Sequence, residues 1–171
     1  MDYRYCLSVD RWAFRPWLHL RLLDPERTDR PDQPAVSQMD NPTDCDTFPC
    51  EALSAAVRQF NEGRYFVCHE TLEDLWKDEA GPMRDLYKGI LQIGIGLLHW
   101  QKGNFGGACA LLKGGIGYLH PFAPVCRRLD VQTLLRDSER FLQRLRAAGA
   151  AHMADIPHSF VPRIGWREDT C

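Results

Sequence analysis

The sequence predicts an all-α protein, a compact antiparallel bundle of about five helices that follows a disordered N-terminal extension. Apolar residues recur at helical spacing across residues 47–148, and Gly, Asn, Asp and Pro divide that range into separate segments. Alternation of apolar and polar residues is nowhere long enough to predict a strand. Because the connections are short, we expect neighbouring helices to run antiparallel.

The N-terminal part, residues 1–46, differs in composition from the bundle. Residues 24–46 are rich in Pro, Asp, Thr and Gln and nearly lack aliphatic side chains, so they bury too little surface to offset the entropy cost of ordering. We expect a disordered linker there. Two readings of the arm before it, residues 1–23, are open. Either the arm docks on the bundle, or the start codon has been assigned too early and translation begins at Met39.

The helices of the bundle are bounded by residues that typically start or stop a helix. Gly63 and Gly103 follow the first and third helices, while Asn104 and Asp130 precede the fourth and fifth. The predicted helices are one that ends at Gly63, then about Tyr65–Lys77, Met83–Lys102, Phe105–Leu119 and 131–147. Residues 149–171 are predicted to form an irregular tail that packs back through Ile156, Phe160, Ile164 and Trp166.

Composition and charge restrict the class of protein. The 171 residues carry a formal net charge of -2, so the chain has no overall attraction to nucleic acid or to an anionic membrane. Its 7 cysteines are odd in number and lack C-x-x-C spacing, which favours a reduced, cytoplasmic location over a disulfide framework. The most apolar segment, 86–100, contains Lys88, Gln92 and His99 and is too short to span a bilayer. The arginines in and near the last helix are the one feature that would favour weak binding of an acidic protein or RNA. The sequence is also compatible with a homo-oligomer.

The second predicted helix carries ionisable residues where core residues are expected. On a helical wheel, His69 and Glu73 fall on the same stripe as Tyr65, Leu72 and Trp76, while Glu70 lies at its edge. A charged carboxylate on a core stripe is costly unless it is paired. His69 and Glu73 are four residues apart, so the pattern predicts a hydrogen bond between them.

The third predicted helix is apolar nearly all round, which indicates the central helix of the bundle. Lys88, Gln92 and His99 form one polar row along it, and Gly89 and Gly96 form a neighbouring row. Two glycines in register indicate the close approach of another backbone or a ligand. We expect the second helix to be that partner, with Gln92 and His99 facing His69, Glu70 and Glu73.

This polar set predicts an internal site with several chemical uses. As a binding site for a small ligand it would comprise His69, Glu73, Lys88, Gln92, His99 and Asn104. A single divalent metal ion would be held by His69, Glu73 and His99. In a hydrolase- or lyase-type enzyme, Glu70 or Glu73 would be the base and His99 an acid or ligand. Binding of a small ligand or metal ion is the leading hypothesis. The remaining alternatives are a purely structural polar network and a helical protein-interaction module.

Two stretches of the sequence carry a family pattern. FNEGRYFVCHETLEDLW, residues 60–76, contains F-N-x-G-x-[FY] and H-E-x-x-E-x-x-W. LYKGILQIGIGLLHWQKGNFGGACALLKGGIGYL, residues 86–119, contains G-x-[IL]-Q, a histidine and G-N-x-x-G-A. In this pattern the chain resembles the uncharacterised all-helical family catalogued as domain of unknown function 309. The resemblance covers roughly residues 48–120 and implies a small helical bundle in soluble bacterial or plastid proteins, without implying an activity.

Overall fold

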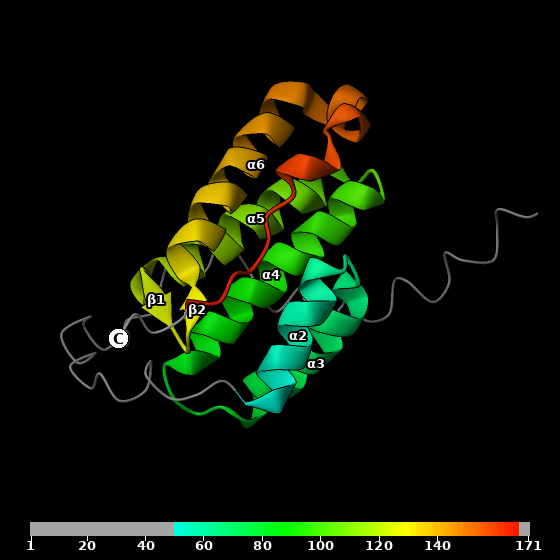
Figure 1. The fold of residues 1–171 in the computed structure, drawn as a ribbon. Coiled ribbons are helices and arrows are strands. Elements are labelled where there is room, and N and C mark those ends of the chain that lie inside the picture. The colour runs from blue at the N-terminus through cyan, green and yellow to red at the C-terminus, as the bar shows by residue number, and fades with distance from the viewer. Residues whose placement is uncertain (1–49, 168–171) are drawn as a thin grey trace, which may run out of the picture. The chain divides into compact units, whose positions relative to one another are not determined.

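The computed structural model describes residues 50–167, and the predicted helical bundle is confirmed there (Figure 1). Residues 1–49, which include the predicted arm and linker, lie outside the described residues, as do residues 168–171. The α-helices are α2 (Glu51–Asn61), α3 (Tyr65–Asp78), α4 (Met83–Gln101), α5 (Phe105–Leu119) and α6 (Val131–His152). Short 3-10 helices cover η2 (His120–Phe122), η3 (Met153–Asp155) and η4 (His158–Phe160).

The helices begin and end where local chemistry favours it. The Asn104 side chain accepts a 3.0 Å hydrogen bond from the Gly107 N–H and caps α5. Asp130 caps α6 in the same way, accepting a 2.9 Å bond from the Thr133 N–H. Gly103 has a φ of 72°, a left-handed conformation that lets the chain turn directly from α4 into α5. The predicted caps and stops are therefore confirmed.

Helix α4 forms the centre of the bundle. Figure 1 shows it between α2 and α3 on one side and α5 and α6 on the other. Thirteen of its residues are buried, among them Leu86, Ile93 and Leu97. Trp100 packs edge-to-face on Phe141 of α6, with ring centroids 5.1 Å apart, and so ties α4 to α6. Within the described part of the chain, no helix is long and apolar enough to cross a membrane.

The backbones of α4 and α5 approach each other closely. A Cβ atom added to Gly89 would lie 2.6 Å from Leu119 Cδ2, and one added to Gly96 would lie 2.9 Å from Leu112 Cγ. The prediction that the glycine row of α4 meets the second helix is therefore wrong. Its partner is α5, because α5 also presents small residues at the crossing: a Cβ on Gly115 would lie 2.7 Å from the Gly89 carbonyl oxygen.

The chain after α5 contains a pair of strands that the sequence pattern did not predict. Strands β1 (Val125–Cys126) and β2 (Leu129–Asp130) form an antiparallel pair too short to show an alternating pattern. Helix α6 extends to His152, but it is kinked at Gly149, where φ is 66° and ψ is 178°, so its first regular stretch ends close to the predicted residue 147.

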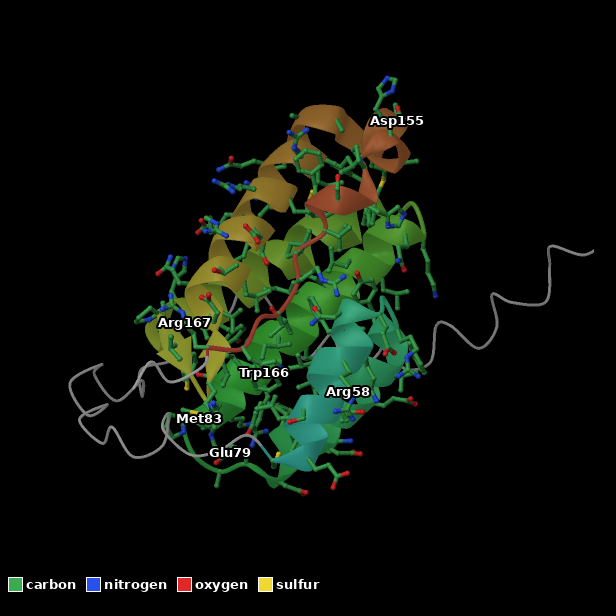
Figure 2. The ribbon with its side chains drawn as sticks, in the orientation of Figure 1. Arg58, Glu79, Met83, Asp155, Trp166 and Arg167 are labelled. Atoms are coloured by element: carbon green, nitrogen blue, oxygen red, sulfur yellow. The ribbon has the colours of Figure 1, made fainter. Side chains whose placement is uncertain are left out.

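The tail after α6 returns along the bundle. Ile156 and Ile164 are buried as predicted, whereas Phe160 and Trp166 are 38% and 42% exposed. Asn61 of α2 holds the tail through two 2.8 Å hydrogen bonds, one to the Ile164 carbonyl and one from the Ile164 N–H. The tail reaches β2 at its end, where Trp166 pairs with Leu129 (Figure 2).

Candidate functional site

His69, Glu73 and Trp76 lie on one flank of α3. The buried line of this helix is Tyr65, Cys68 and Leu72, which packs on α4. Thr71 marks the flank that faces α2, because its hydroxyl donates a 3.0 Å hydrogen bond to Gln59 Oε1. At about 100° per residue, His69, Glu73 and Trp76 fall on the opposite side of the buried line from Thr71.

Two polar atoms on this flank are buried without a partner. His69 Nδ1 and Trp76 Nε1 have no hydrogen-bond partner among the described residues. Burial lowers the pKa of His69, although the charges of Glu73 and Glu70 act to raise it. The imidazole is therefore neutral at neutral pH. It stacks on the ring of Phe66, with centroids 6.4 Å apart and planes 20° apart.

Glu73 forms an ion pair within its own helix. Its Oε1 lies 3.1 Å from Lys77 Nζ, and no hydrogen bond joins it to His69 in the described structure. The two residues lie near enough for the Glu73 charge to act on the His69 pKa. Next along the flank, the guanidinium of Arg84 lies 4.1 Å from the Trp76 ring centroid and so connects α3 to α4.

Glu70 faces a different side of α3 from His69 and Trp76. It is exposed and lines a shallow groove of about 320 Å³ together with Ala52 of α2 and with Leu75 on the α2 side of α3. Glu70 and Glu73, the two candidate bases, therefore have different surroundings. One borders an open surface groove, and the other is ion-paired on the flank that carries His69.

The polar row of α4 contacts α5. The Lys88 ammonium lies 4.3 Å from the centroid of the Tyr118 ring. Gln92 is only 4% exposed, and its Oε1 has no hydrogen-bond partner in the described part of the chain. That oxygen lies against Gly114, so close that it would clash with a Cβ atom there. Both residues contact α5, whereas the sequence predicted that Gln92 faces the second helix.

His99, at the end of the row, is held by the cap of α5. Its Nδ1 lies 2.8 Å from Asn104 Nδ2, and Asn104 Oδ1 accepts from the Gly107 N–H. Because an amide nitrogen can only donate, His99 Nδ1 is the acceptor, which assigns the neutral tautomer with its proton on Nε2. Burial, followed by the charge of Lys102, lowers the His99 pKa and favours this neutral form.

Helical geometry directs the two polar strips toward the same side of the bundle. Helix α4 meets α3 through Arg84 and Gly94, the latter lying close to the Tyr65 ring, and it meets α5 through Gly89 and Gly96. At about 100° per residue, Lys88, Gln92 and His99 fall between these two directions. We call this region the α3–α5 seam: it is bordered by His69, Glu73 and Trp76 of α3 and by Lys88, Gln92 and His99 of α4.

The residues of the seam do not form a metal-ligand cluster. Across residues 50–167, no three His, Cys, Asp or Glu side chains are close enough to hold one metal ion. His69, Glu73 and His99 are therefore not brought together as the ligand set that the sequence suggested. Glu73 is paired with Lys77, and His99 Nδ1 accepts from Asn104.

Trp76 borders the seam and Tyr118 of α5 contacts the seam residue Lys88, yet neither was among the sequence candidates. Trp76 was assigned to the apolar stripe, yet its position seven residues after His69 places its indole N–H on the same flank. That spacing was a usable signal. The contact between Lys88 and Tyr118 depends on the register of α4 against α5, which the sequence pattern does not specify.

The described residues form a small helical bundle, and one stretch of it matches a known family model. Residues 53–111 match the family described as Domain of unknown function (DUF309). The predicted resemblance is confirmed over that stretch, which includes His69, Trp76, Gln92 and His99.

One curated relative adds to the comparison. Over 56 residues the chain is 38% identical to "Uncharacterized protein YpuF" of Bacillus subtilis (strain 168). The match covers 32% of each protein, so the chain aligns with about a third of the length of this relative. No solved structure shows a significant match to the chain.

Proposed function

We propose that the helical domain binds a small polar ligand in the α3–α5 seam. The supporting observation is that three buried polar atoms of seam residues lack hydrogen-bond partners: His69 Nδ1, Trp76 Nε1 and Gln92 Oε1. Each such atom costs about 1–3 kcal/mol when it is buried unpaired, and native proteins contain few of them. Three at one seam are expected of a binding site that gains its hydrogen bonds from a ligand.

The unpaired atoms indicate the chemistry of the ligand. The indole N–H of Trp76 donates, the amide oxygen of Gln92 accepts, and the neutral imidazole of His69 can do either. The carboxylate of Glu73 is neutralised by Lys77. This set suits an uncharged molecule that offers both donors and acceptors on a small frame, such as an amide or a nitrogen heterocycle.

The other uses of the same residues have less support. A divalent metal ion would require Glu73 to leave Lys77 and the three candidate ligands to move together. An enzyme that uses Glu70 as base would need its substrate in the surface groove beside Ala52, which neither His69 nor Trp76 lines. A purely structural network would be expected to satisfy the buried atoms of His69 and Gln92, which have no partner among residues 50–167.

The test removes two hydrogen-bonding groups while keeping the shape of the side chains. The full chain and a Trp76→Phe/Gln92→Leu double variant are purified without denaturation, and their small-molecule extracts are compared by mass spectrometry. We expect a compound that is enriched in the wild-type extract and missing from that of the double variant. Ser138→Ala is the matched control, because Ser138 Oγ is also buried and unpartnered but belongs to α6, away from the seam.

A second measurement covers a ligand that is lost during purification. The indole N–H resonance of Trp76 is followed by NMR while the low-molecular-weight fraction of a cell extract is added. A shift that is absent in Gln92→Leu supports the proposal. Identical extracts of the wild-type and variant chains, together with an unchanged indole resonance, would contradict it.

A further inference from the structure

The outer surface of α3 carries a row of acidic side chains beside an apolar floor. The groove of about 320 Å³ introduced above is here called the acidic groove, and it is lined by Ala52, Val67, Glu70, Thr71, Asp74, Leu75 and Asp78. Glu70, Asp74 and Asp78 are exposed and spaced four residues apart, so they stand in line along one side of the helix. No ion pair joins any of the three to another residue between 50 and 167.

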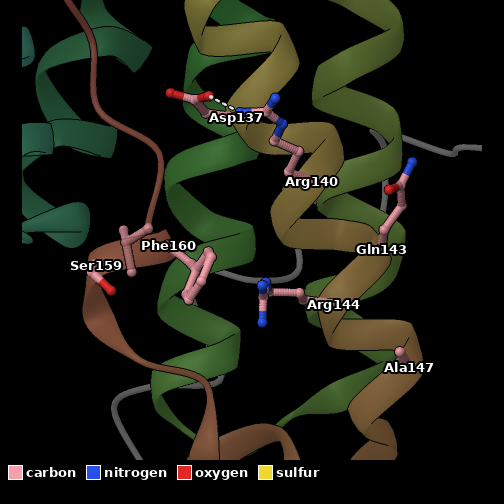
Figure 3. A pocket seen from close by; sticks show the side chains of 8 residues that line it. Asp137, Arg140, Gln143, Arg144, Ala147, Ser159 and Phe160 are labelled. Atoms are coloured by element: carbon pink, nitrogen blue, oxygen red, sulfur yellow. Dashed lines mark ion pairs between the residues drawn. The ribbon is translucent and has the colours of Figure 1, made fainter.

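Helix α6 presents the opposite charge. A second groove, of about 730 Å³, lies between α6 and the returning tail and is here called the basic groove (Figure 3). Arg140 and Arg144 line it, and Arg136 continues the same row one turn earlier. Phe160 of the tail supplies an apolar wall, 38% exposed, with the Arg144 guanidinium 3.5 Å from its ring centroid.

The two rows match in spacing as well as in charge. Both follow an interval of four helical residues, which corresponds to about 6 Å along each axis. Each row is accompanied by exposed apolar surface, Val67 beside the acids and Phe160 beside the arginines, so that contact would bury apolar area while opposite charges meet. One acid on α6, Asp137, lies 3.0 Å from Arg136 and 3.9 Å from Arg140 and balances that row only in part.

A single chain cannot join its own two rows. Helices α3 and α6 lie on different sides of the bundle, with α4 and α5 between them (Figure 1). A second copy of the protein, however, always offers a row of arginines with the same spacing along its own α6.

We propose that the acidic groove of one copy binds the basic face of a second copy, which comprises Arg136, Arg140 and Arg144, with α6 of one chain lying along α3 of the other. Such a contact joins two different surfaces, so each dimer keeps one free acidic groove and one free basic face. Association therefore extends beyond the dimer as concentration rises. It weakens with salt, because the paired charges lie at an exposed interface.

The experiment is sedimentation velocity of the full chain at low ionic strength over a range of concentrations. One variant blocks the acidic groove with Glu70→Gln, Asp74→Asn and Asp78→Asn. The other blocks the basic face with Arg136→Gln, Arg140→Gln and Arg144→Gln. All six positions are exposed, so the fold is expected to persist, and circular dichroism checks it.

The proposal predicts a specific pattern across the mixtures. The wild-type chain sediments faster as its concentration rises, and added salt reverses the effect. Each blocked variant alone is monomeric, whereas an equal mixture of the two forms a dimer and nothing larger, because only one interface remains. A charge-matched control with Glu62→Gln, Asp85→Asn and Asp155→Asn removes three acids outside the groove and associates like the wild type.

Two results would overturn the proposal. One is a wild-type chain that stays monomeric at low ionic strength throughout the concentration range. The other is a mixture of the two blocked variants that contains only monomers while the wild type associates, since association would then use a different surface. Neither result bears on the ligand proposed for the α3–α5 seam, which lies on the other flank of α3.

Discussion

Gly89 and Gly115 bring the backbones of α4 and α5 into direct contact. A Cβ atom on Gly115 would lie 2.7 Å from the Gly89 carbonyl oxygen and 2.9 Å from the backbone nitrogen of Ile93. Both atoms belong to the central helix, so neither can turn aside as a side chain can. This contact fixes the register that places Tyr118 over Lys88 and Gly114 against Gln92.

Gly115→Ala is therefore expected to destabilise the domain. Helix propensity alone would favour alanine, but the contact with the α4 backbone should cost about 1–3 kcal/mol of unfolding free energy. Gly117 is the matched control, because it lies in the same helix and a Cβ atom there meets nothing within 4 Å. Gly117→Ala should stabilise the domain by about 0.5–1 kcal/mol. Urea unfolding of both variants checks the difference, and effects of equal sign would contradict the packing argument.

The sequence predicted the helices more completely than their contacts. Helix ends depend on local chemistry, such as the side chain of Asn104 or the left-handed torsion of Gly103, and a short stretch of sequence contains that information. A helical wheel places Gln92 and Gly89 around their own axis but does not specify which neighbouring helix lies there. The polar row was therefore found, while its contact with α5 was not.

The sequence also could not predict that the His69 imidazole lacks a hydrogen bond to Glu73. The sequence suggested that His69 and Glu73 would bond to each other, since they are four residues apart. Lys77 lies four residues beyond Glu73 and is the partner that Glu73 adopts. A sequence pattern gives the separations at which side chains can meet, whereas the choice between two available partners depends on rotamers and burial.

Asn104 is expected to control both the start of α5 and the protonation of His99. Asn104→Ala removes the cap and should lower the unfolding free energy by about 1 kcal/mol. Asn104→Asp can still accept from the Gly107 N–H, but a carboxylate cannot donate to His99 Nδ1. The aspartate favours a protonated imidazole, so the His99 pKa should rise. NMR titration of the histidine ring protons measures this, and an unchanged His99 pKa in Asn104→Asp would rule out the assigned tautomer.

Acidification is expected to destabilise the domain through His69. Burial lowers the pKa of His69 from its ordinary value of 6.5, so the folded chain binds this proton less readily than the unfolded chain. Stability is then full above pH 6.5 and falls as the pH drops from 6.5 towards the lower folded-state pKa. Each such histidine contributes a slope of at most about 1.4 kcal/mol per pH unit.

The contribution of His69 can be isolated by comparing variants. His69→Gln should flatten the dependence of unfolding free energy on pH below 6.5. His99, whose pKa burial also lowers, contributes to the part that remains. His152→Gln is the control, because His152 lies exposed near the end of α6. Denaturant unfolding at several pH values measures the slopes. A His69→Gln variant with the slope of the wild type would show that this imidazole does not resist protonation in the folded state.

Gln92 is expected to lower the stability of the domain when no ligand is bound. Its amide is 4% exposed and its oxygen lies unpaired against Gly114, so desolvation is not offset by a hydrogen bond. Gln92→Leu replaces the amide with an apolar group of similar size and should raise the unfolding free energy by about 1 kcal/mol. A residue kept for packing alone would show the opposite sign. Thermal unfolding of the wild-type and Gln92→Leu proteins, both freed of bound small molecules, measures the sign of the change. A loss of stability in Gln92→Leu would mean that Gln92 stabilises the bundle rather than binding a ligand.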